Sequence, residues 1–175
     1  AFDRICVAGS LGHANLGFVA LEKKRSGFEE YKNAFLRPTA KIKEGLWLGK
    51  QSDVTAMMDL SDGLYIDLKR LSTASQLGFE IELAHLKLSS QWRVDCKQLD
   101  LDPIHTLLTG GEDYSLLLTV NNERYESLAF NFKQVFGYEL QAIGFMVPEL
   151  GIRLIENGAL KEIELHPFTQ FGEPL

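Results

Sequence analysis

Apolar and polar positions follow two different periods along the chain, and these periods predict both strands and helices. Alternating or short continuous apolar runs predict strands at residues 4–8, 54–58, 78–83, 114–120, 141–145, 152–155 and 161–165. Apolar residues three or four apart predict helices at 15–24, 28–36, 42–49, 89–95 and 122–131, and another that begins near Gly63. Strands and helices alternate early, and a hairpin at 156–158 closes the chain. The pattern therefore predicts one α+β domain, a mixed β-sheet with packed α-helices.

Two aspartates interrupt the largely apolar segment VTAMMDLSDGLYIDL at residues 54–68. Burying a carboxylate costs free energy unless a positive group compensates it. The strand is expected to end at or near Asp59, so Asp59, Ser61 and Asp62 line a tight strand-to-helix turn, where ligands gather in sheets flanked by helices. Mg²⁺ prefers one or two protein carboxylates together with phosphate oxygens, and the Ser61 hydroxyl can hold a phosphate. The turn is thus a candidate site for a metal ion and a phosphate.

Helix capping is the alternative interpretation of this turn. Serine and aspartate are favoured at helix N-caps, and an aspartate in the first turn interacts well with the helix dipole. Capping explains Ser61 or Asp62, but it leaves Asp59 unexplained because that residue precedes the cap. Asp67 lies one turn into the predicted helix, away from its apolar face, and is interpreted as solvated.

A second acidic loop, TGGEDY at residues 109–114, precedes a strongly apolar strand. Two glycines permit backbone shapes that other residues resist, and they would give a ligand access. In a functional turn, Glu112 would point at that ligand. The alternative is an ordinary Gly-Gly turn in which Glu112 and Asp113 are simply solvated.

The composition restricts the classes of function. The chain has 175 residues, of which 45% are hydrophobic and 24% charged, which suits a soluble globular domain. Eighteen basic and 24 acidic residues give a formal charge of −6, with no basic cluster to favour nucleic acid or a membrane surface. Two isolated cysteines fit a reducing cytoplasm, and neither a membrane span nor a signal peptide is expected. The chain opens directly on a predicted strand, so we expect it to be part of a longer protein.

Several motifs together resemble a known enzyme family. MDLSDGL at residues 58–64 resembles the DISDGL motif of bacterial thiamine-monophosphate kinase, and TGGEDY at 109–114 resembles that family's TGGEDY motif. VAGSLG at 7–12 and FLRP at 35–38 are similar to further family segments, in the same order. The resemblance implies that residues 1–175 are the C-terminal domain of a two-domain kinase in the aminoimidazole ribonucleotide synthetase superfamily. The N-terminal domain, with further metal-binding aspartates and the dimer interface, would lie outside this chain.

The resemblance also implies an activity and a set of site residues. A homodimeric enzyme of this family phosphorylates thiamine monophosphate to thiamine diphosphate with ATP and Mg²⁺. By motif, Asp59 and Asp62 would bind Mg²⁺, Ser61 would contact ATP, and Glu112 would contact the thiamine phosphate substrate. PFTQF at residues 167–171 aligns with a Gly-aromatic-x-His-Phe stretch of the family, with Pro for Gly and Gln for His, which implies that Phe168 would also contact this substrate. The isolated domain is expected to be inactive. The alternatives are a non-catalytic nucleotide-binding fragment and a sister ATP-dependent synthetase of the same superfamily.

Overall fold

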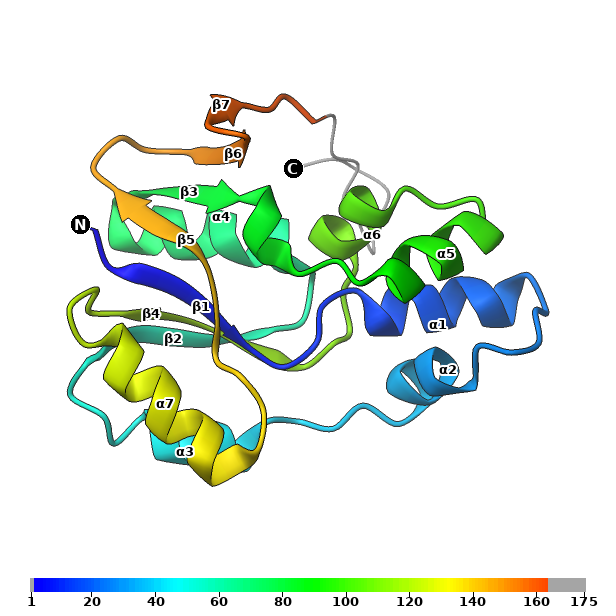
Figure 1. Cartoon of the computed structure of the whole chain (residues 1–175), viewed down its shortest axis with the longest axis horizontal. Helices are drawn as coiled ribbons and strands as arrows, with labels where there is room; N and C mark the ends of the chain where they lie inside the picture. The colour runs from blue at the N-terminus through cyan, green and yellow to red at the C-terminus, as the bar shows by residue number, and fades with distance from the viewer. Residues whose placement is uncertain (1, 164–175) are drawn as a thin grey trace.

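The computed structural model describes residues 2–163, which form a mixed sheet in the strand order β2-β4-β1-β5-β3-β6-β7 (Figure 1). The strands are β1 (Arg4–Ala8), β2 (Val54–Leu60), β3 (Gly78–Glu82), β4 (Ser115–Val120), β5 (Gln141–Val147), β6 (Ile152–Glu156) and β7 (Ala159–Leu160). Neighbouring strands are antiparallel, except that β3 and β6 run parallel. The predicted α+β class with a mixed sheet is confirmed.

Helices cover both faces of this sheet. They are α1 (His13–Glu22), α2 (Glu29–Leu36), α3 (Ile42–Leu48), α4 (Leu64–Ser75), α5 (Ser90–Gln98), α6 (Pro103–Thr109), α7 (Tyr125–Phe136) and the 3-10 helix η1 (Leu83–Leu86). Alternate residues of β1 enter two separate hydrophobic clusters, Ile5 and Val7 in one and Cys6 and Ala8 in the other. The first cluster includes side chains of α1, α4, α5 and α6, and the second includes side chains of α3 and α7. Figure 1 shows α3 and α7 together on one side of the sheet.

The element predictions are confirmed for most strands and helices, with shifted ends. Strand β2 continues to Leu60, so Asp59 lies in the last part of a strand and not in the turn. The helix expected at 122–131 occupies Tyr125–Phe136, because residues 121–124 form a turn in which the Arg124 amide donates to the Asn121 carbonyl. Helices α6 and η1 were not predicted.

The return strand predicted at 161–165 is wrong in position. Ile155 pairs with Leu160 and Glu156 with Ala159, which leaves a two-residue turn of Asn157 and Gly158. Both turn residues have positive φ, 53° and 77°, as a tight hairpin turn requires, so the return strand begins at Ala159. Residues 161–163 are not in a strand, and 164–165 lie outside the described residues. Among the helices at residues 2–163, none has the length and hydropathy needed to cross a membrane.

Candidate functional site

Two acidic segments, called the acidic loops here, are residues 59–63, which include the end of β2, and residues 109–114. Hydrogen bonds between their backbones join them. The Glu112 amide donates to the Ser61 carbonyl at 2.8 Å, and the Tyr114 amide donates to the Leu60 carbonyl at 3.0 Å. These bonds extend the antiparallel pairing of β2 with β4, whose last paired residues are Leu60 and Ser115. Figure 1 shows the links β2–α4 and α6–β4 at the same end of the sheet. The fold thus brings the predicted residues of both motifs to one place.

Two glycines make this close approach possible. Gly63 has φ 103°, and a Cβ atom built on it would lie 2.9 Å from the Thr109 carbonyl oxygen. A Cβ atom on Gly111 would lie 2.7 Å from the Ser61 carbonyl oxygen. Each loop therefore has a glycine where the backbone of the other loop leaves no room for a side chain.

The acidic side chains of the two loops share one electrostatic environment. Asp59 is exposed, whereas Ser61, Asp62 and Glu112 are half-buried. The Tyr114 hydroxyl donates to Glu112 Oε2 at 3.0 Å. This bond is the main cause of the raised pKa of Tyr114, and the negative charges of Asp59 and Asp62 raise it further. Glu112 and both aspartates therefore act on the same phenol.

Asp67 was interpreted as solvated, and this is wrong, because its side chain is fully buried. Its Oδ2 accepts hydrogen bonds from the Ser61 amide at 3.1 Å and the Asp62 amide at 3.2 Å. Its Oδ1 accepts a bond from Arg70 Nη1 at 2.8 Å, and the same nitrogen forms an ion pair with Asp62 Oδ2. Burial raises the pKa of Asp67, while the bonds from the Asp62 amide, Arg70 and the Ser61 amide oppose that rise.

The interpretation of Ser61 or Asp62 as a helix cap is also wrong. The N-cap residue of α4 is Gly63, and no side chain caps this helix end. Asp67 instead bonds the two amides that precede the helix. Ser61 and Asp62 are thus held by the helix and do not cap it.

The second loop holds the glycine turn that follows β1. Asp113 Oδ2 accepts from the Gly12 amide at 2.5 Å and Oδ1 from the Ala14 amide at 3.0 Å, which caps the start of α1. Burial raises the pKa of Asp113 to about 6, although the amide bonds oppose this rise. The buried Ser115 hydroxyl donates to the Ser10 carbonyl at 2.8 Å. The alternative that Asp113 is simply solvated is therefore wrong.

The donor set fits a partial site for a divalent cation. Within residues 2–163, no group of three or more His, Cys, Asp or Glu side chains is arranged to hold a metal ion. Asp59 and Asp62 supply two carboxylates, and Mg²⁺ often takes only one or two from a protein, with phosphate and water completing its shell. Phe168, the predicted aromatic contact, lies outside the described residues.

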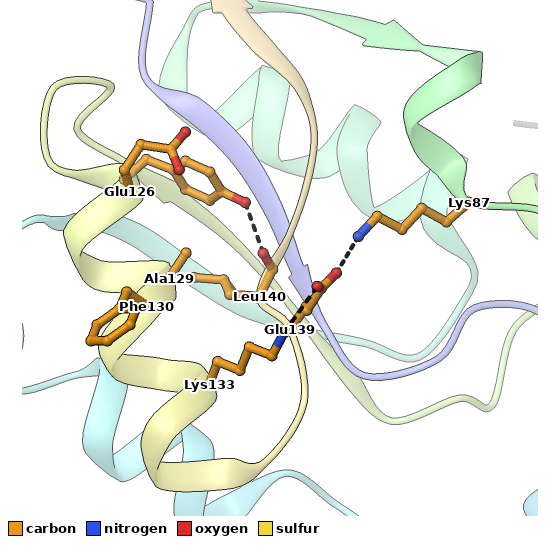
Figure 2. A pocket seen from close by; sticks show the side chains of 8 residues that line it. Lys87, Glu126, Ala129, Phe130, Lys133, Glu139 and Leu140 are labelled. Atoms are coloured by element: carbon orange, nitrogen blue, oxygen red, sulfur yellow. Dashed lines mark hydrogen bonds and ion pairs between the residues drawn. The ribbon is translucent and has the colours of Figure 1, made fainter.

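One surface hollow shares no residue with the two acidic loops. It has a volume of about 280 Å³ and lies between α7, the two residues that precede β5 and Lys87, which follows η1. Figure 2 shows Glu139 in this hollow, bonded to both Lys87 and Lys133. Because Glu139 partly neutralises both Lys87 and Lys133, these lysines are poorly placed to bind an anion in this hollow.

Sequence reasoning missed three residues that organise the loops: Asp67, Arg70 and Asp113. The spacing of Asp67 and Arg70, three apart on a helix, is a usable signal, because such pairs meet on one face. Nothing local in the sequence indicates that Asp113 bonds amides about 100 positions earlier in the chain.

Comparison with known proteins agrees with the motifs and the fold. The family model described as AIR synthase related protein, C-terminal domain, matches residues 3–154. The thiamine-monophosphate kinase of Aquifex aeolicus is 35% identical over 127 residues, which cover 70% of this chain and 41% of the relative. Relatives of this kind are matched over about half of their length.

Solved structures show the same architecture. The structure described as AaThiL complexed with AMPPCP and TMP has a TM-score of 0.74 and 28% identity, covering 94% of this chain and 50% of the other. A thiamine-monophosphate kinase from Stenotrophomonas maltophilia K279a has a TM-score of 0.78 and 25% identity, covering 90% of this chain and 51% of the other. With the match over residues 3–154, these findings show that the chain belongs to the family described as AIR synthase related protein, C-terminal domain.

Proposed function

We propose that this chain is the C-terminal part of a thiamine-monophosphate kinase, which transfers a phosphoryl group from ATP to thiamine monophosphate with Mg²⁺. The observation that carries the proposal is the joining of two acidic loops, with Asp59, Asp62 and Glu112, in a chain similar to such kinases. A related structure that contains AMPPCP and TMP supports the pairing of a nucleotide with this substrate.

Each loop would have its own role in this reaction. Asp59 and Asp62 would hold Mg²⁺, Ser61 would contact ATP, and Glu112 would contact the thiamine phosphate. Bound Mg²⁺ would neutralise the negative charge that spreads over the transferred phosphoryl group. The accepting phosphate is already ionised at neutral pH, so these residues need only bind and orient, and no general base is required.

The complete enzyme is expected to need residues that residues 2–163 do not supply. Two carboxylates are few for a site that must bind Mg²⁺ and two phosphorylated ligands. We therefore expect the isolated chain to bind Mg-ATP weakly and to form no thiamine diphosphate. A homodimer in the cytoplasm, and a contact from Phe168, remain predictions for the full-length protein.

Titration calorimetry with Mg-ATP tests the metal assignment. Asp59→Asn and Asp62→Asn are each expected to weaken binding about tenfold, since each removes one charged ligand. Asp100→Asn is the matched control, because it removes the same charge from a largely exposed aspartate that pairs with Lys23. Unchanged affinity in both site variants would contradict the proposal. Glu112→Gln should weaken thiamine monophosphate binding and leave Mg-ATP binding within about twofold.

Assays of product distinguish the alternatives. Formation of thiamine diphosphate by the isolated chain would contradict the expected inactivity. In a longer protein that contains this chain, activity on aminoimidazole precursors and none on thiamine monophosphate would favour the sister synthetase. Nucleotide binding without any product would favour the non-catalytic fragment.

A further inference from the structure

We infer that Asp67 is a positioning residue for the Ser61–Asp62 turn, and that Arg70 is a resident cation that Mg²⁺ displaces from Asp62. The inference rests on the proposed function, because it takes Asp62 as a ligand of Mg²⁺. Neither Asp67 nor Arg70 was among the residues that the family motifs identified.

The two oxygens of the Asp67 carboxylate have different partners. Asp67 Oδ2 accepts from both the Ser61 and the Asp62 amide, whereas Oδ1 accepts from Arg70. Two successive peptide planes are thereby fixed to a side chain that is fully buried on α4. A buried carboxylate stays where its partners are, because leaving them unpaired is costly. Ser61 and Asp62 therefore start from a backbone that the helix holds in place.

Arg70 is the cation beside Asp62. Arg70 Nη1 contacts carboxylate oxygens of both Asp62 and Asp67. Asp67 lies three positions before Arg70 on α4, so helix geometry alone keeps the guanidinium beside Asp67. The Arg70 side chain is 51% exposed, so it has room to shift away from Asp62 while it stays bonded to Asp67. Arg70 contacts only Oδ2 of Asp62, but a metal ion bound to the same carboxylate would place a second positive charge beside the guanidinium, so the two cations compete for Asp62.

Asp62 thus has two arrangements, one paired with Arg70 and one bound to metal. Without metal, its carboxylate is paired with Arg70 and its charge is partly neutralised. With metal, Arg70 leaves Asp62 and keeps Asp67 as its partner, while the Asp67 bonds to the two amides are unchanged. The turn thus needs no backbone rearrangement when Mg²⁺ arrives.

A titration of the chain with MgCl₂, followed by the NMR signals of the Ser61 and Asp62 amides, tests the competition. Arg70→Gln removes the competing cation and is expected to tighten Mg²⁺ binding about two- to fivefold, the range of an exposed ion pair. Arg153→Gln is the matched control, since it breaks a similar pair with Glu149 away from the loops. Unchanged or weaker binding by Arg70→Gln overturns the displacement of Arg70.

A pair of substitutions at Asp67 tests the positioning. Asparagine retains an oxygen that can accept from both amides, whereas alanine retains none. Mg²⁺ is expected to bind about tenfold more weakly to Asp67→Ala than to Asp67→Asn, because a lost supporting bond typically costs that much in metal affinity. Hydrogen exchange at the Ser61 and Asp62 amides should be faster in the alanine variant only. Equal affinity and equal exchange in the two variants overturn the positioning role.

Asp62→Asn separates this inference from the proposed function. If Asp62→Asn leaves Mg²⁺ binding unchanged, the metal assignment itself fails. If it weakens binding but Arg70→Gln does not tighten it, the displacement of Arg70 fails and the metal assignment stands. Arg70 is half-exposed, so Arg70→Gln should fold even if Asp67→Ala does not.

Discussion

Replacing Gly63 by alanine tests whether the two acidic loops depend on their close backbone contact. Gly63 has φ 103° and ψ 152°, a conformation that is essentially restricted to glycine. Alanine there is expected to cost up to about 3 kcal/mol in strain. Its Cβ would also lie 2.9 Å from the Thr109 oxygen and 3.0 Å from the Thr109 carbonyl carbon, so backbone must move. We expect a loss of about 3 kcal/mol in the free energy of unfolding, or about 6–12 °C in Tm.

The assay is urea unfolding of wild type and variants, with two glycines as references. Gly137→Ala places alanine at φ 78° with nothing within 4 Å, so it isolates the cost of positive φ without a clash. It should cost about 1 kcal/mol. Gly111→Ala would place a Cβ 2.7 Å from the Ser61 oxygen without a positive φ, so it isolates the cost of the close contact from the cost of backbone strain. A Gly63→Ala variant no less stable than Gly137→Ala would refute the reasoning that the two loops are in direct backbone contact.

Further predictions concern Asp113, which supports the site, and a hydrogen bond between α2 and α5. Asp113→Ala should lower the free energy of unfolding by about 1–2 kcal/mol in urea, because α1 loses its cap; a change below about 0.3 kcal/mol would contradict this. Because the folded pKa of Asp113, about 6, exceeds the usual value of 3.8, the part of its stabilisation that depends on protonation is fully present below about pH 4 and is lost as the pH rises through about 6. Asp113→Asn should remove that loss, whereas Asp100→Asn should not. Tyr31→Phe should cost about 1 kcal/mol by thermal unfolding, since its hydroxyl donates to the buried Asp95 at 2.8 Å; an unchanged Tm would oppose this.

The sequence was most informative where a pattern is local. Apolar runs located the strands, and the two motifs that resemble those of thiamine-monophosphate kinase identified Asp59, Asp62 and Glu112 as candidate site residues. Helix α6 also had a local signal, Asp102 at the N-cap followed by Pro103, but its seven residues are too few for a clear period. Short helices of this kind are easily read as loops.

The remainder of the site depends on contacts between distant segments. Helical periodicity indicated that Asp67 lies off the apolar face, but it could not indicate that this face meets the preceding turn. The pairing of β2 with β4 joins residues about 60 positions apart, and an alternating pattern does not identify a strand's partner. Asp113 is a similar case, because its two amide partners follow β1.

The central claim is that the two joined loops together bind the nucleotide and the thiamine phosphate. The most direct measurement is an NMR map of amide shifts when Mg²⁺, AMPPCP and thiamine monophosphate are added to the chain. The largest changes are expected at residues 59–62 and 109–114. Changes confined to the hollow around Lys87 and Lys133, with both loops unaffected, would contradict the account.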